Sequence, residues 1–252
     1  MQIAMLLAVL GIIGVFVLLV FLMFTSAKKE NARKKELAWS LGFRPVEKPD
    51  QVLTEQIFAL HRHTQNPRFS LKNVYVRNTP EGQVYLYDLD DHSGDSTSVV
   101  ANMGVAIVTP GRDLPRFNIF PRINLEGKLA TFANRAMEWL VSGDMEKVVL
   151  DDYPDFDHRY LVTASDAFKV KEILNTDLMN LLMHQEMMSV DLTERRVTNG
   201  MVSVNADGET LSVSNTGLKS SGQKITAEEI RARVDLALAI SRALDQKQPV
   251  QS

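Results

Sequence analysis

The chain contains no cysteine and no motif for a common catalytic chemistry. Without cysteine, a disulfide framework and a cysteine-held metal or redox centre are both excluded. The sequence also lacks a Gly-x-Ser-x-Gly nucleophile elbow and a glycine-rich phosphate loop followed by Lys-Ser or Lys-Thr. The absence of cysteine fits the reducing cytoplasm, although cysteine-free domains are also ordinary in oxidising compartments.

Basic charge is scarce over most of the chain. The full sequence has 28 basic and 31 acidic residues, and residues 28–36 alone hold five of the basic and two of the acidic ones. The remainder therefore has 23 basic and 29 acidic residues, a net charge of −6. Because nucleic-acid binding requires a basic face, we expect no nucleic-acid partner.

One long apolar run begins the chain. Ile3 to Phe24 is 22 residues long with no charge and no proline, and a helix needs about 20 such residues to cross a bilayer. A cleaved signal peptide fits less well, because Met1 and Gln2 are not basic and the run exceeds the usual ~7–15 residues, although Thr25-Ser26-Ala27 resembles a cleavage site. A buried core helix fits poorly because no face is polar. The sequence therefore predicts a transmembrane anchor over residues 1–27, with the bilayer contacted through residues 3–24.

A cluster of basic residues follows this run, and none precedes it. Lysine and arginine near a span stay on the cytoplasmic side. We therefore expect a single-pass protein of the inner (plasma) membrane, with its N-terminus outside and its C-terminal domain in the cytoplasm. The cluster is either a topology signal alone or also a contact for anionic lipid, at ~1 kcal/mol for each side chain. Its members are Lys28, Lys29, Arg33, Lys34 and Lys35.

The rest of the chain predicts a basic juxtamembrane helix over residues 28–42, a cytoplasmic α+β domain over 43–246 and a disordered tail over 247–252. Glu30 lies four residues before Lys34, the favourable order for a helical ion pair, and Gly42 supplies a C-terminal stop. As a free-standing stalk, this helix would hold the domain roughly 20 Å from the bilayer. The domain would then fold without it.

Hydrophobic periodicity indicates both strands and helices within the domain. A period of two from Phe69 to Thr109 predicts an antiparallel meander with a turn at Thr79–Gly82. Leu114–Pro121, bounded by prolines, is predicted as an edge strand. Strands interleaved with a few amphipathic helices indicate an α+β fold. The other expected elements are helices from Asp50 to Leu60, Ala130 to Val141, Asp166 to Leu181 and the Thr226–Glu229 capping box to Leu244, strands at Val148–Leu150 and Tyr160–Thr163, and a hairpin from Thr193 to Asn215 with its turn at Asn205–Gly208.

Three groups of polar residues are candidates for chemistry, and each has an ordinary structural explanation. His61 and His63 are two residues apart and would point away from each other on a helix, so joint metal ligation is not expected. The acidic turn Asp88–Asp95 fails the spacing of a calcium loop and ends without its glutamate. The turn Asp151–Asp157, followed by His158, is typical of a solvated turn with proline. The sequence therefore predicts no catalytic residue, no cofactor site and no metal site.

Two short patterns carry a resemblance to a family. The first is Leu114-Pro115-x-Phe117 with Pro121 four residues on, and the second is Pro154-x-Phe156-x-x-x-Tyr160-Leu161-Val162-x-x-x-Asp166, which runs into a helix. With the hairpin and the glutamate-rich helix that follow, this order resembles uncharacterised bacterial membrane-anchored proteins with a domain of unknown function. The resemblance covers most of residues 42–244. Members often have glycine where Ser165 stands, and a glycine-rich loop in place of Leu129–Val141. The resemblance implies no activity, and these prolines and aromatic residues are expected to be architectural.

We expect a non-enzymatic, membrane-tethered cytoplasmic domain that binds an unknown protein partner or the membrane surface, because an anchor is present and catalytic motifs are absent. Two alternatives stay open. One is a hydrolase-type enzyme that uses the acidic turn near Asp155 and His158. The other is a lipid-binding module of pleckstrin-homology-like shape, with a sheet capped by a C-terminal helix. A deep pocket at the acidic turn would favour the enzyme, and a broad apolar patch would favour a protein partner.

Overall fold

The computed structural model describes residue 25 and residues 28–61, 68–93, 97–122, 145–184, 190–191, 196–197, 202–215 and 225–246. The predicted span at residues 3–24, the predicted helix from Ala130 to Val141 and the tail at 247–252 lie outside these residues. Within the described ranges, no helix has the length and hydropathy needed to cross a membrane.

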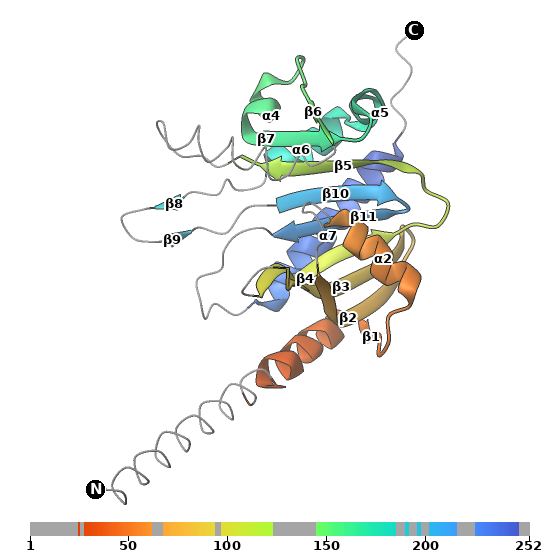
Figure 1. Cartoon of the computed structure of the whole chain (residues 1–252), viewed down its shortest axis with the longest axis vertical. Helices are drawn as coiled ribbons and strands as arrows, with labels where there is room; N and C mark the ends of the chain where they lie inside the picture. The colour runs from red at the N-terminus through yellow and green to blue at the C-terminus, as the bar shows by residue number, and fades with distance from the viewer. Residues whose placement is uncertain are drawn as a thin grey trace, which may run out of the picture.

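A nine-stranded sheet forms the centre of the described chain (Figure 1). The strands follow the order β1-β2-β3-β4-β11-β10-β5-β7-β6, and neighbouring strands are antiparallel. A separate two-stranded sheet pairs β8 with β9. The strand bounds are β1 Arg44–Pro45, β2 Phe69–Thr79, β3 Gly82–Asp91, β4 Ser98–Val108, β5 Leu114–Pro121, β6 Glu146–Val148, β7 Tyr160–Ala164, β8 Val190–Asp191, β9 Arg196–Val197, β10 Val202–Gly208 and β11 Thr210–Asn215.

The meander and the hairpin predicted from the period of two are confirmed. β2, β3 and β4 are successive neighbours, and β10 pairs with β11. The β2–β3 turn requires Gly82, which has a φ of +137° and where a Cβ would collide with the carbonyl oxygen of Val108. The hairpin turns later than predicted, because β10 continues through Gly208.

The prediction that Leu114–Pro121 is an edge strand is wrong. β5 lies between β10 and β7, inside the sheet. The residues that pair on both sides are Phe117 to Ile119, whereas Pro121 pairs with β7 alone at the strand end. Pro115 precedes the doubly paired segment, next to an irregularity in the β10 register. The two prolines therefore avoid the positions where a missing N–H would break a ladder, and they mark the ends of a strand rather than the edge of a sheet.

Helices cover both faces of the sheet. α7 (Ala227–Asp245) packs on β4 and β11, and α2 (Gln51–Leu60) packs on β10 and β11. The predicted Asp50 cap of α2 and the predicted capping box of α7 are both confirmed. Tyr85 of β3 belongs to the α2 core and Leu86 to the α7 core, so the two cores lie on opposite faces, since neighbouring strand residues alternate. The α+β prediction is confirmed, and the open sheet with helices on both faces differs from the pleckstrin-homology-like shape.

The helix predicted from Asp166 to Leu181 is two helices, α5 (Ala167–Ile173) and α6 (Thr176–Met183). Asp166 caps α5 as predicted. Asn175 caps α6 by accepting from the Leu178 N–H at 2.8 Å, while its Nδ2 donates to the Ala243 carbonyl of α7 at 2.6 Å. A tertiary contact therefore fixes a break that the apolar spacing did not reveal. The short α4 (Pro154–Arg159) precedes β7.

The segment predicted as a juxtamembrane helix is helical at residues 28–40 and is part of the domain rather than a free-standing stalk. Ala38, Leu41 and Phe43 are buried in the α7 core, and Leu37 packs against it. Gly42, with a φ of +80°, ends the helix as predicted and leads into β1. The core therefore continues across the boundary predicted between residues 42 and 43.

Replacing Tyr160 by alanine is expected to lower the free energy of unfolding by about 3 kcal/mol, as other large-to-small core changes do. The residue is 4% exposed, its ring stacks on Phe156 at 4.8 Å, and its hydroxyl donates to the Leu182 carbonyl at 2.7 Å. Tyr160→Phe keeps the ring and is expected to cost about 1 kcal/mol, for the lost hydrogen bond alone. Chemical denaturation measures both values. A loss below roughly 0.5 kcal/mol for alanine would contradict a structural role.

Candidate functional site

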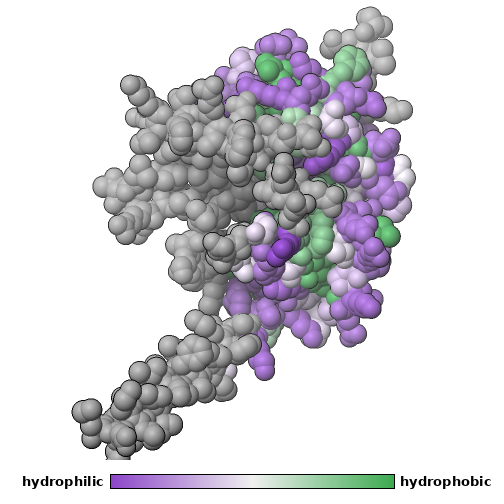
Figure 2. Space-filling view, viewed as in Figure 1, coloured by the Kyte–Doolittle hydropathy of each residue, from purple (hydrophilic) through white to green (hydrophobic). Residues whose placement is uncertain are grey.

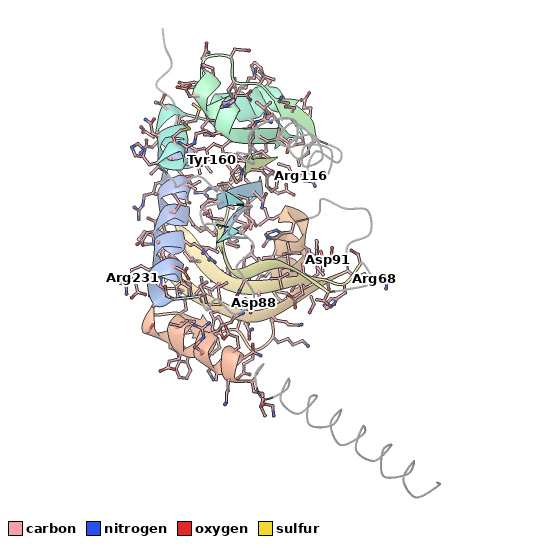
Figure 3. The ribbon with its side chains drawn as sticks, turned by 90° about the vertical axis from the view of Figure 1, so that its left-hand side faces the viewer. Arg68, Asp88, Asp91, Arg116, Tyr160 and Arg231 are labelled. Atoms are coloured by element: carbon pink, nitrogen blue, oxygen red, sulfur yellow. The ribbon has the colours of Figure 1, made fainter. Side chains whose placement is uncertain are left out.

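Asp88 of β3 is the centre of a buried polar network that joins the juxtamembrane helix to the sheet (Figure 3). Its carboxylate accepts from the Lys34 ammonium at 2.7 Å, the Asn73 amide at 2.7 Å and the Met103 backbone N–H at 2.8 Å. Lys34 is 8% exposed and Asp88 is 7% exposed. The Asn73 amide also donates to Asn31 at 3.0 Å. We call this set of residues the Asp88 lock.

Two backbone bulges aim donors at Asp88. Asn73 in β2 and Met103 in β4 have φ values of +48° and +49°, in the left-handed region that non-glycine residues rarely adopt. The registers of β2 and β4 against β3 shift at these positions, as a bulge requires. The buried Arg233 of α7 donates to the carbonyls of Asn102 and Met103 at 2.9 and 3.1 Å. The strained β4 bulge is thus held by Asp88 at its backbone N–H and by Arg233 at its carbonyls.

The predicted basic cluster divides into two kinds of residue. Lys34 belongs to the lock, and Arg33 pairs with Glu30 at 2.6 Å and donates to the Ile225 carbonyl just before α7. Lys28 and Lys29 are exposed, and the exposed Lys35 lies over the Trp39 ring at 4.7 Å. Lys34 is therefore unavailable to lipid in the folded protein. A lipid contact, if the cluster makes one, is carried by Lys28, Lys29 and Lys35.

A cleft of about 200 Å³ opens where the juxtamembrane helix ends against β2 and α7. Its lining residues are Ser40, Leu41, Phe43, Arg77, Arg231, Val234 and Asp235. The Arg77 guanidinium lies 4.8 Å from the centre of the Phe43 ring and donates to the Leu41 carbonyl at 3.0 Å. Arg231 lies on the outer side of α7 near the juxtamembrane helix (Figure 3). The cleft therefore brings together two guanidinium groups, the carboxylate of Asp235 and the apolar side chains of Leu41, Phe43 and Val234.

The acidic turns do not form a shared site. Asp155 and His158 are both exposed on α4. The other predicted turn is partly strand, since β3 continues through Asp91, and Asp90 in β3 pairs with Lys72 at 3.1 Å. Burial opposes ionisation of Asp91, but hydrogen bonds from the Ser93 and Arg68 backbones hold the pKa of Asp91 below its ordinary value. Within the described residues, no group of three or more His, Cys, Asp or Glu side chains is placed to hold a metal ion.

His61, at the end of α2, is buried. Its Nε2 lies 2.7 Å from the Tyr87 hydroxyl, which in turn lies 2.7 Å from the Ser212 hydroxyl. Burial raises the pKa of Tyr87 well above its ordinary value. His63 falls outside the described residues. These three side chains form a buried hydrogen-bonded chain. Sequence spacing could not show it, because His61 follows α2, whereas Tyr87 lies in β3 and Ser212 in β11.

A row of buried polar side chains crosses the α2 face of the sheet. The registers place Ser212, Asn205, Asn118 and Thr163 opposite one another on four adjacent strands, all buried. Asn205 Oδ1 and Thr163 Oγ1 have no hydrogen-bond partner among the residues that the structure describes. The alternation of polar and apolar residues in β10 and β11 is typical of a solvated face, so only the structure reveals that this face is covered.

The described surface in Figure 2 is largely hydrophilic, with hydrophobic residues in small separate groups. Exposed large hydrophobic residues are dispersed along the chain, and Trp39, at 56% exposed, directly precedes the cleft residue Ser40. This view therefore does not show the broad apolar patch that is typical of a stable protein interface.

No protein-family model and no curated protein matches the chain. Among solved structures, the fold is similar to the crystal structure of the mycobacterial trehalose monomycolate transport factor A, TtfA. The match has a TM-score of 0.49 and 10% identity, and it covers 88% of this chain and 98% of that one. A similarity of this size transfers no function.

Proposed function

We propose that this chain is a single-span membrane protein whose α+β domain is a binding module for the cytoplasmic surface of the membrane. The Lys34–Asp88 pair is the observation that carries the proposal, because it joins the segment after the predicted span to the sheet at a separation of 2.7 Å. Burying a charge is costly unless it is paired. A segment that served only as a tether would gain nothing from burying Lys34.

The short distance between the predicted span and the lock supports a position at the bilayer. Asn31, which accepts a hydrogen bond from Asn73 of β2, comes seven residues after Phe24. Seven residues of helix span about 10 Å. The edge of the domain near Asn73 would then lie close to the lipid headgroups. Lys28 and Lys29, exposed in this interval, provide the attraction to anionic lipid.

The absence of cysteine allows a test of sidedness with single introduced cysteines. In the full chain, Asn102→Cys places a thiol at an exposed position next to Met103, and Asp152→Cys places one at an exposed position in the turn before α4. A membrane-impermeant maleimide is expected to label neither thiol in intact spheroplasts and both after lysis, because the domain is cytoplasmic. Labelling without lysis would place the domain outside and overturn the orientation.

The same two variants test whether the domain is held at the surface. In nanodiscs with anionic lipid and nitroxide-bearing headgroups, a fluorophore at Asn102 is expected to be quenched more strongly than one at Asp152. Lys28→Gln with Lys29→Gln should reduce the difference, and so should replacing anionic with neutral lipid. Equal quenching at the two positions in anionic nanodiscs would contradict a surface-bound domain.

A further inference from the structure

We propose that the cleft between the juxtamembrane helix, β2 and α7 binds a single anionic group, a phosphate or a carboxylate, carried by a ligand that approaches from the aqueous side. The site goes beyond the membrane contact proposed above, because it uses different residues at the other end of the juxtamembrane helix. The two cations of the cleft, Arg77 and Arg231, come from β2 and α7.

Arg77 is held in place for such a ligand. Its guanidinium is fixed by the Leu41 carbonyl and by the face of Phe43, and both partners are themselves buried in the core. A planar guanidinium held in this way loses little side-chain freedom when it binds an oxyanion in a bidentate manner. The left-handed turn at Gly42 lets the chain bring Leu41 and Phe43 to the same guanidinium. Arg77 is therefore a preorganised half of the site.

Arg231 provides the available charge. It is exposed on α7, and among the described residues it makes no ion pair within 4.0 Å. Asp235 lies four residues later on the same helix and also lines the cleft. The order Arg before Asp is the less favourable one for a helical pair, so Asp235 competes only weakly for Arg231. Asp235 instead opposes an incoming anion, and its removal should strengthen binding.

Size and position decide what kind of ligand fits. The cleft volume of about 200 Å³ is below the roughly 300–1,000 Å³ of sites that enclose a whole small molecule, so it accommodates one charged group. Ser40 comes nine residues after Asn31, and nine helical residues span about 14 Å. The cleft is therefore farther from the predicted span than the lock, which favours a water-soluble source of the anion over a lipid headgroup.

The test is thermal unfolding of the full chain in nanodiscs of neutral lipid, with inorganic phosphate compared with chloride at equal ionic strength. A ligand that binds only the folded state raises the melting temperature with its concentration. Phosphate also stabilises proteins by exclusion from their surface, so the decisive quantity is the difference between variants. Arg231→Gln removes a cation of the cleft and should weaken phosphate binding. Asp235→Asn removes the nearby negative charge and should strengthen it. Lys171→Gln on α5 is the control for the change in net charge. All three residues are exposed, so none of these variants should disturb the core.

The dependence of the melting temperature on phosphate concentration gives the Kd. In Arg231→Gln the phosphate Kd is expected to be about tenfold weaker, a loss of about 1.4 kcal/mol in binding free energy, and in Asp235→Asn it is expected to be tighter. Lys171→Gln should match the parent chain. Equal phosphate shifts in all four proteins would show surface exclusion only and overturn the site. In nanodiscs of anionic lipid without phosphate, Arg231→Gln should leave the melting temperature unchanged, whereas a drop would assign the cleft to headgroups and overturn the aqueous source. Lys28→Gln with Lys29→Gln should keep the phosphate response, so failure of the membrane contact and failure of this site are distinguishable.

Discussion

Asp88→Ala is expected to lower the free energy of unfolding by about 3–5 kcal/mol, the usual cost of leaving a buried charge without its partner. The substitution removes the acceptor of the buried Lys34 ammonium at 2.7 Å. It also removes Oδ1, which accepts from the Met103 N–H, and Oδ2, which accepts from the Asn73 amide. The two strained backbone positions would then lose the interaction that offsets their conformational cost of about 1–3 kcal/mol each.

Asp90→Ala is the matched control, two residues further along the same strand. Asp90 pairs with Lys72, whose side chain is 53% exposed, and surface pairs of this kind contribute about 0–1 kcal/mol. Chemical denaturation of both variants gives the comparison. Lys34→Met should be milder than Asp88→Ala, because Asp88 keeps its two remaining donors and the lysine stem is replaced by an apolar one. An Asp88→Ala loss as small as that of Asp90→Ala would show that the lock does not hold the helix.

Elements with a local signal were predictable from the sequence. The Asp50 cap, the Thr226–Glu229 capping box and the Gly42 stop each depend on residues within one helical turn, and all three are present. The Thr79–Gly82 turn is of the same kind, because it depends on the conformational freedom of one glycine. Caps and turns that depend on neighbouring residues are therefore enough to predict where these elements begin and end.

The order of the strands and the break at Asn175 were not predictable in this way. β5 lies inside the sheet because β10 and β11, about 90 residues later in the chain, insert between it and β4. Asn175 ends α5 because it bonds α7, 68 residues away. Such contacts leave no periodic trace in the sequence, whereas the prolines of β5 are compatible with either a strand end or a sheet edge.

The candidate site likewise has a part that was visible in the local sequence and a part that depends on distant contacts. The basic cluster was visible in the sequence, but its separation into a buried lysine and exposed ones depends on Asp88, 54 residues from Lys34. The sequence predicts one acidic turn over Asp88–Asp95, whereas Asp88 and Asp91 both lie in β3, where Asp88 is buried and Asp91 is partly exposed. Arg77 and Arg231 had no signal at all, since the cleft forms from segments 154 residues apart in sequence.

A fragment that begins at Gly42 is expected to lose cooperative unfolding, whereas a fragment of residues 28–246 should retain it. The shorter fragment lacks Leu41, and truncating a buried leucine alone costs about 2–5 kcal/mol. It also lacks Lys34, the ion-pair partner of the buried Asp88. Added to the loss of the fully buried Ala38, these effects are comparable to the whole stability of a typical domain, about 5–15 kcal/mol.

A third fragment, residues 36–246, separates the two contributions. It keeps Ala38 and Leu41 in the core and lacks Arg33 and Lys34, so it should unfold cooperatively but at a lower temperature than residues 28–246. Circular dichroism and calorimetry of the three fragments measure the transitions. If the fragment from Gly42 unfolds cooperatively at the same temperature as residues 28–246, the helix contributes nothing to the core and the boundary at residue 42 stands. If only the loss of residues 36–41 removes the transition, apolar packing holds the juxtamembrane helix to the domain and the Asp88 lock serves to orient it.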